Sequence, residues 1–219
     1  MSNPLYTMTH NLLPTSLLAR LLAFGLLVLT VAASPLQPVQ AQDNSADAIQ
    51  QMLEERDQQI KSILQGDTTF TAQQREELKT LINGVIDFRA MAQQALGPFW
   101  ADLSDAQRTE FVDVFQDIVR SQSMADLEVY NSEVTYNTID VSGDSAFVRT
   151  ATQYRGTSAN VEYVLHREDG TWLAEDIIVD EVSTAESYAR SFQTVVRKRG
   201  FDALMDSLRK KREQIAARN

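Results

Sequence analysis

The apolar pattern changes its period near residue 130, and this change restricts the chain to few folds. Apolar residues recur at helical spacing over residues 45–129, and they then alternate as in β-strands. Short turns separate the predicted strands, and such short connections join only antiparallel neighbours. We therefore expect a meander sheet of four strands or slightly more. The predicted strands are residues 132–141, 145–155, 160–168 and 171–181.

About six helices are expected to pack on this sheet. The first helix carries Met52 and ends near Gly66, and the fourth runs to about Leu127. Two helices follow the strands, so the order is that of an α+β fold and not of an alternating α/β fold. No linker or repeat interrupts residues 42–219, which predicts a single domain. The predicted caps or separators of the later helices are Thr71, Asp87, Ser104, Ser183 and Gly200.

The N-terminal region resembles an export signal. The apolar run 21–33 follows Arg20 and is too short to span a bilayer as a helix. Val39-Gln40-Ala41 is typical of a cleavage site, so we expect residues 1–41 to be a signal peptide that is cleaved after Ala41. The chain has no cysteine, which is compatible with a periplasmic protein that folds without disulfides. The alternative is an uncleaved membrane anchor.

Charge is spread unevenly along the chain. The net charge of −10 argues against nucleic-acid binding, which requires a basic surface. Residues 197–219 nevertheless carry an excess of five positive charges. These bases either complement helix C-termini or form a docking surface for an acidic partner or for phosphate head groups. The candidate docking residues are Arg209, Lys210, Lys211 and Arg212.

The residues predict neither catalysis nor metal binding. His166 is the only histidine after residue 41, and a single histidine in a strand is seldom a catalytic base. The sequence has no nucleophile elbow, phosphate-binding loop or zinc-protease motif. Strand alternation separates the acidic residues into two pairs on opposite sides, so they do not converge on a metal ion. These pairs are Asp176 with Asp180 and Glu175 with Glu181. After these exclusions, the class of protein that the residues favour is a binding protein without a cofactor.

Both sides of the predicted sheet carry apolar residues. Alternation places Trp172 and Ile178 on one side of the last strand and Ile177 on the other. Such a sheet is covered on both faces. Either two helical layers fill both sides, or one face forms a wall of a cavity for an apolar ligand. Periodicity does not distinguish these arrangements, because a packed core and a lined pocket use the same residue types.

Several motifs resemble the toluene-tolerance/MlaC family, in order and over nearly all of residues 42–219. Residues 86–100 are similar to the family segment DF..MA...LG..W, and residues 104–115 have its S..Q...F...F spacing. The strand from Trp172 to Ile177 resembles W...D(V/I), and Val182-Ser183 begins a likeness to VS…Y.R.QF. Gly200 and Leu204 match the G...L ending. Glu181 departs from the pattern, since the family has Gly there, and the family's Tyr is absent near residues 121–124.

This resemblance implies a periplasmic phospholipid carrier of the Mla system, which maintains outer-membrane lipid asymmetry. Its partners would be an outer-membrane lipoprotein complex and an inner-membrane ABC transporter complex, contacted transiently by a monomer. The implied fold is α+β with an apolar cavity, and no cofactor or catalytic step is implied. The residues we expect to line the cavity are Phe88, Met91, Phe111, Phe115, Val148, Tyr163, Leu165, Ile178 and Tyr188. A periplasmic chaperone or adaptor for apolar protein segments is the alternative, followed by a small enzyme that uses His166 or Asp176.

Overall fold

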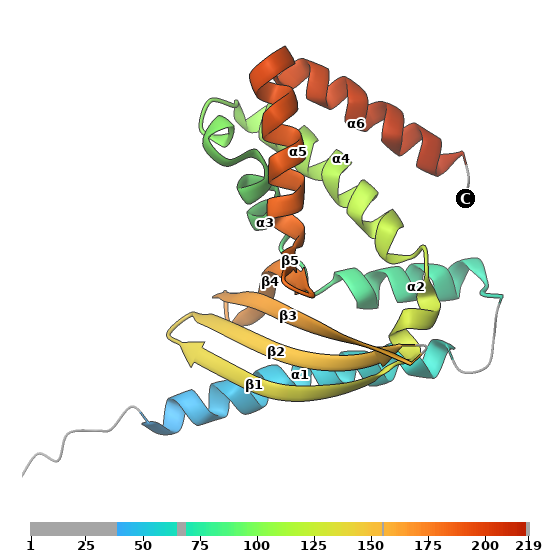
Figure 1. Ribbon diagram of the computed structural model, residues 1–219, viewed down its shortest axis with the longest axis vertical. Helices are drawn as coiled ribbons and strands as arrows, with labels where there is room; N and C mark the ends of the chain where they lie inside the picture. The colour runs from blue at the N-terminus through green and yellow to red at the C-terminus, as the bar shows by residue number, and fades with distance from the viewer. Residues whose placement is uncertain (1–38, 65–68, 155, 218–219) are drawn as a thin grey trace, which may run out of the picture. The chain divides into compact units, whose positions relative to one another are not determined.

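Helices precede and follow a single β-sheet in the computed structural model, which describes residues 39–64, 69–154 and 156–217 (Figure 1). The helices before the sheet are α1 (Val39–Leu64), α2 (Ala72–Asn83), α3 (Phe88–Leu96) and α4 (Asp105–Ser123), with 3₁₀ turns η1 (Gly97–Trp100) and η2 (Leu127–Asn131). Those after it are α5 (Thr184–Arg199) and α6 (Phe201–Ala216). The α+β prediction with about six helices is confirmed.

The predicted signal peptide lies outside the described residues, except that positions 39–41 fall at the start of α1. The predicted helix end near Gly66 also falls outside them, and α1 is described to Leu64. The fourth helix ends at Ser123, four residues before the predicted limit of Leu127, where η2 begins instead. None of the helices in the described ranges is long and apolar enough to cross a membrane.

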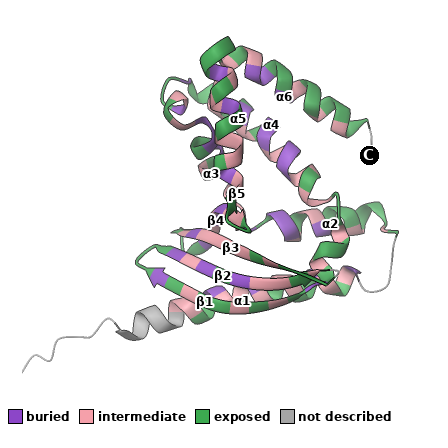
Figure 2. Cartoon of the chain, in the orientation of Figure 1, coloured by how far each residue is buried: buried purple, intermediate pink, exposed green. Residues whose placement is uncertain are grey.

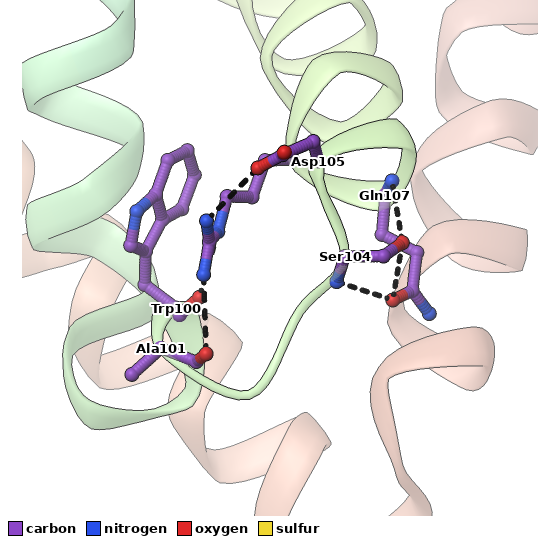
Figure 3. A network of polar contacts seen from close by, with 6 residues as sticks. Trp100, Ala101, Ser104, Asp105 and Gln107 are labelled. Carbon is purple, nitrogen blue, oxygen red and sulfur yellow. Dashed lines mark hydrogen bonds and ion pairs between the residues drawn. The ribbon is translucent and has the colours of Figure 1, made fainter.

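Local capping sets the predicted helix starts. Thr71 and Ser104 each form a capping box with the glutamine three residues later, which satisfies two backbone N–H groups at each helix start. Arg108 then donates to the carbonyl oxygens of Trp100 and Ala101, each at 3.1 Å, and pairs with Asp105 (Figure 3). These contacts fix the turn between η1 and α4.

The sheet is an antiparallel meander with strand order β1-β2-β3-β4-β5. The predicted four long strands are confirmed, and a two-residue fifth strand follows them. The predicted extension of the fourth strand to residue 181 is wrong, because Asp180 and Glu181 adopt φ values of 46° and 67° and turn the chain. The strands are β1 (Glu133–Ser142), β2 (Ser145–Tyr154), β3 (Thr157–Glu168), β4 (Thr171–Val179) and β5 (Val182–Ser183).

A register shift opposite Val164 and Leu165 inserts one extra residue, Glu175, into β4. Tyr163 consequently pairs with Ile177, whereas Ile178 pairs with Glu162. Residues that pair across an antiparallel ladder share a face. Trp172 therefore shares a face with Ile177 and not with Ile178. The predicted assignment of these residues to the two faces of the sheet is wrong. Strict alternation fails because the bulge reverses the phase within one strand.

Buried positions lie on the helices as well as on the sheet (Figure 2). The buried apolar residues that the structure describes form three clusters, the smallest of which packs the end of α1 against α2. A helical core draws on α3, η1, α4, α5 and α6, around Phe111 and Phe115. A sheet core packs Ile49 and Leu53 of α1 against one face of the sheet, around Val148. On the opposite face Phe147, Val164 and Ile178 are half-buried. Burial is therefore unequal on the two faces, which the prediction of a sheet covered on both sides did not anticipate.

Strand β4 joins the helical core to the sheet at two places. Backbone bonds link Ala174 to Val85 at 2.6 Å and to Asp87 at 2.9 Å, beside an isolated parallel bridge to Ile86. Further along β4, the buried carboxylate of Asp176 accepts from the backbone N–H of Ala185 at 2.9 Å, near the start of α5. The positions of α3 and α5 relative to the sheet thus depend on one strand.

Gly97 ends α3 in a conformation that side chains disfavour, with φ 54° and ψ −127°. A Cβ atom there would lie 2.6 Å from Nε2 of Gln193 on α5. We expect Gly97→Ala to lower the free energy of unfolding by about 1–3 kcal/mol in urea denaturation. Gly143→Ala is the control, because Gly143 has φ 61° but nothing within 4 Å of the added atom. A smaller loss at position 97 than at 143 would contradict this prediction.

Candidate functional site

An apolar cleft of about 470 Å³ lies between the end of β4, strand β5 and helix α5. Its rim exposes two valines, Val179 at 42% and Val182 at 56% of their surface. Large apolar side chains this exposed, next to a hollow, are typical of a binding surface. The residues that line the cleft are Val179, Val182, Thr184, Ser187, Tyr188, Ser191 and Phe192.

Tyr188 connects the cleft to the helical core. Its ring centre lies 4.9 Å from that of Phe115 in an edge-on contact and 5.3 Å from that of Phe192. The hydroxyl donates a hydrogen bond to Oε1 of Gln122 on α4. Burial raises the pKa of the Tyr188 phenol, and the bond to Gln122 partly opposes this shift. Tyr188 thus has an apolar ring in the cleft and a polar end anchored on α4.

The nine residues predicted to line a cavity are distributed over both cores. Five belong to or pack on the helical core, and of these only Tyr188 lines the cleft. Three belong to or pack on the sheet core, and Ile178 lies on the opposite face of the sheet. The cavity itself stays a prediction. The five residues of the helical core are Phe88, Met91, Phe111, Phe115 and Tyr188. The three residues of the sheet core are Val148, Tyr163 and Leu165.

Val179 and Val182 line the cleft but are not among the residues predicted to line a cavity. A strand predicted to reach residue 181 includes Val179 as an ordinary alternating residue. The available signal was the break at Asp180-Glu181, since acidic residues favour turns over strands. Recognition of that turn would have placed Val182 at the start of a new strand at the edge of the sheet.

Three tyrosines lie in low-dielectric surroundings at the sheet. Burial, assisted by the charge of Asp57 on α1, raises the pKa of Tyr163 to about 12. Burial likewise raises the pKa of Tyr130 to about 12 and that of Tyr136 further still. The acidic side chains Asp57 and Glu54 add to the shift at Tyr136. An edge of half-buried tyrosines therefore borders the sheet core.

These shifts predict a loss of stability at high pH. Below pH 10 the phenols are protonated in both states, so they contribute no pH dependence. Above pH 10 the unfolded chain loses these protons first, and the free energy of unfolding falls until about pH 12. Urea denaturation across this range measures the effect, and Tyr163→Phe should make the decline shallower. An equally steep decline in that variant would contradict the assignment to Tyr163.

The predicted docking residues do not act as one group. Arg209 forms ion pairs with Glu110 at 2.7 Å and Asp206 at 3.0 Å, so its charge is used within the fold. Lys210 and Lys211 are exposed, and Arg212 lies 3.7 Å from Asp117. Docking by these residues stays a prediction. Of the four, Lys211 and Arg212 line a second hollow, of about 750 Å³, between α2, α4 and α6.

His166 lies beside Asp87, with Nε2 3.1 Å from Oδ2, and neither residue lines either hollow. Glu168 offers a third ligand atom within 4.8 Å of the other two, so this trio has the geometry to hold a metal ion. Of the four acidic residues in β4 and the turn that follows it, Glu175 lies near this trio, with Oε2 3.8 Å from Nδ1 of His166. Asp176 is buried under α5 and Asp180 accepts from the backbone of Asn160 at 2.9 Å, while Glu175 is the bulge residue and Glu181 is in the turn.

Comparison with known proteins places the fold. The family model of the MlaC protein matches residues 45–210. The phospholipid-binding protein from Ralstonia solanacearum, solved in complex with a phospholipid, is similar in structure with a TM-score of 0.65 and 21% sequence identity, over 78% of this chain and 98% of that one. No curated protein matches. At 21% identity the structural likeness shows a shared fold, and the family match covers well over half of the residues, so the chain belongs to the MlaC family.

Proposed function

We propose that this protein is a periplasmic phospholipid carrier that moves single lipids between an outer-membrane complex and an inner-membrane ABC transporter. The observation that carries the proposal is membership of the MlaC family. The similar fold of a phospholipid-binding protein and the open apolar cleft beside Tyr188 support it. The proposed activity is binding and release, without a catalytic step.

The energetics of acyl chains explain why a carrier is needed. Burial of one methylene group is worth about 0.8 kcal/mol, so two chains with about 30 methylenes represent on the order of 20 kcal/mol. A single lipid therefore crosses water only inside an apolar site. Transfer from a bilayer to such a site is nearly neutral in free energy, because both environments are apolar. Direction must come from partners that favour either the loaded or the empty carrier.

We place the acyl chains beside α5, with entry at the cleft and a path between the helical core and the sheet. The cleft of about 470 Å³ provides the entry, and Phe115 and Phe192 lie directly behind Tyr188. Helix α5 is tied to the sheet near its first turn, through Asp176.

Native mass spectrometry of the full chain, purified from a bacterial periplasm, tests the proposal. We expect one phospholipid per protein, and we expect the delipidated protein to take up lipid from phosphatidylglycerol–phosphatidylethanolamine vesicles. A protein that is empty and takes up no lipid from these vesicles would exclude the carrier function. Captured peptides in place of lipid would favour the chaperone alternative.

The cleft is tested with a charge at its rim. Val182→Asp should lower lipid uptake by about tenfold or more, because a carboxylate would replace apolar contact with the acyl chains. Val182 is 56% exposed, so we expect the thermal midpoint to remain close to that of the unmodified protein. Val129→Asp is the matched control, at an exposed valine in η2 that does not line the cleft. Equal uptake by the two variants would show that lipid enters elsewhere.

A further inference from the structure

The hollow between α2, α4 and α6, which we call the cationic groove, gathers charges from three distant parts of the chain. It has five basic and two acidic residues on a protein whose net charge is −10. A cationic hollow on an acidic protein concentrates the field where an anion would bind. The charged residues of the groove are Arg75, Glu76 and Lys79 from α2, Asp117 and Arg120 from α4, and Lys211 and Arg212 from α6.

The two acidic residues do not neutralise the groove. Glu76 lies 3.4 Å from Lys79, and Asp117 lies 3.7 Å from Arg212, which leaves three cations. The guanidinium of Arg120 rests 5.0 Å from the centre of the Phe88 ring, where the charge stays available to a ligand. Arg75 and Lys211 form no ion pair with any other residue that the structure describes. The groove thus has unused positive charge on all three of its walls, from Arg75 on α2, Arg120 on α4 and Lys211 on α6.

The remaining lining residues indicate what kind of anion fits. Four are apolar, and Ser121 and Gln122 add short polar groups between them. A small inorganic anion would leave the apolar part uncovered, whereas a ligand with a phosphate at one end and a hydrocarbon part at the other would cover both. The apolar residues of the groove are Met124, Ala125, Ile215 and Ala216.

The cationic groove adjoins the apolar cleft through one hydrogen-bonded pair. Gln122 lines the groove and Tyr188 lines the cleft, and the Tyr188 hydroxyl donates to the side-chain oxygen Oε1 of Gln122. A lipid whose chains enter beside Tyr188 would therefore have a cationic surface next to its polar end. The two hollows are complementary to the two ends of a single amphipathic molecule.

We propose that the cationic groove binds the phosphate-bearing head group of an anionic phospholipid, so that the carrier selects anionic over zwitterionic lipids. This inference rests on the proposed carrier function, because it assigns a head-group preference to the same lipid site. Arg75 and Lys211 provide the attraction from opposite walls. A zwitterionic head group gains less there, because its own cation meets the same positive field.

The test compares vesicles of phosphatidylglycerol with vesicles of phosphatidylcholine, and native mass spectrometry measures the loaded fraction. We expect roughly tenfold preferential loading with phosphatidylglycerol, which declines as salt is added, because exposed charges are screened. Arg75→Glu combined with Lys211→Glu should reduce this preference to near unity, mainly through a loss of phosphatidylglycerol loading. Arg197→Glu combined with Lys210→Glu is the matched control, since it changes net charge equally at exposed positions outside the groove.

The possible results distinguish a wrong head-group site from a wrong carrier function. If the unmodified protein loads neither lipid, the carrier proposal itself fails. If it loads both lipids equally, or if the groove variant keeps the preference, only the head-group site is wrong. If the control variant loses the preference for phosphatidylglycerol to the same extent, the preference comes from overall charge and the proposed head-group site is wrong. Binding of an acidic partner protein that the groove variant loses, with lipid preference intact, would overturn it in favour of protein docking.

Discussion

Phe111→Ala is expected to lower the free energy of unfolding by about 3–5 kcal/mol, the range for loss of a buried phenylalanine. Phe111 is fully buried in the helical core. Its ring centre lies 5.8 Å from that of Phe115, 5.9 Å from that of Phe192 and 6.2 Å from that of Phe201. Removal of the ring opens a cavity where helices α4, α5 and α6 meet. Urea denaturation, with the midpoint and slope fitted separately, measures the loss.

Phe147→Ala serves as the comparison for this variant. Phe147 is half-buried on the face of the sheet opposite α1, with the Arg149 guanidinium 4.6 Å from its ring centre. Its loss removes less buried area and leaves an open surface that water can fill, so we expect a decrease of about 1 kcal/mol. A Phe111→Ala protein no less stable than the Phe147→Ala protein would show that the aromatic cluster does not dominate the core.

Asp176→Ala is expected to cost about 2–4 kcal/mol and to impair lipid uptake as well. The buried Asp176 carboxylate accepts hydrogen bonds from the backbone N–H groups of Ile177 and Ala185, at 2.8 and 2.9 Å, and from the hydroxyl of Ser183. Hydrogen bonds to a charged group are among the stronger ones, and buried donors left without a partner add a desolvation cost. Helix α5 would lose its attachment to β4, and Tyr188 would shift with it.

Asp140→Ala provides the matched control for a lost carboxylate. Asp140 is also in a strand and pairs with Arg149 at 3.0 Å, but its side chain is 67% exposed. An exposed ion pair contributes little, so we expect a change within about 1 kcal/mol and normal lipid uptake. Equal effects of the two substitutions on stability and uptake would refute the role assigned to Asp176 in positioning α5.

The helix starts were predictable because their causes are local. A capping box at Thr71 or Ser104 uses residues only three positions apart, which a sequence displays directly. The four long strands followed from the same kind of local pattern and from short turns. The fifth strand was missed because its turn places two acidic residues at positive φ. The family Gly at position 181 is explained by this geometry, since glycine adopts positive φ without steric cost.

The candidate site was less predictable, because its residues are brought together by folding. Arg75 and Lys211 are on α2 and α6, and only their packing against α4 forms the groove. The bulge at Glu175 decides which residues of β4 lie on which face of the sheet, and simple alternation does not predict a bulge. The function of Asp176 as an acceptor for α5 required knowledge of where α5 begins. Tyr188 alone was predicted to line the ligand site and does line the cleft.

The helical core combines helices that precede the sheet in the sequence with helices that follow it, and this affects the rate of folding. Gln193 on α5 donates to the carbonyl of Ala95 on α3 across 98 residues, and Arg209 reaches Glu110 across 99. Helical proteins usually fold fast because their contacts are local, whereas contacts between distant residues slow folding. This helical core cannot form until α5 and α6, which begin only at Thr184, are available. We therefore expect it to fold at a rate more typical of a β-protein.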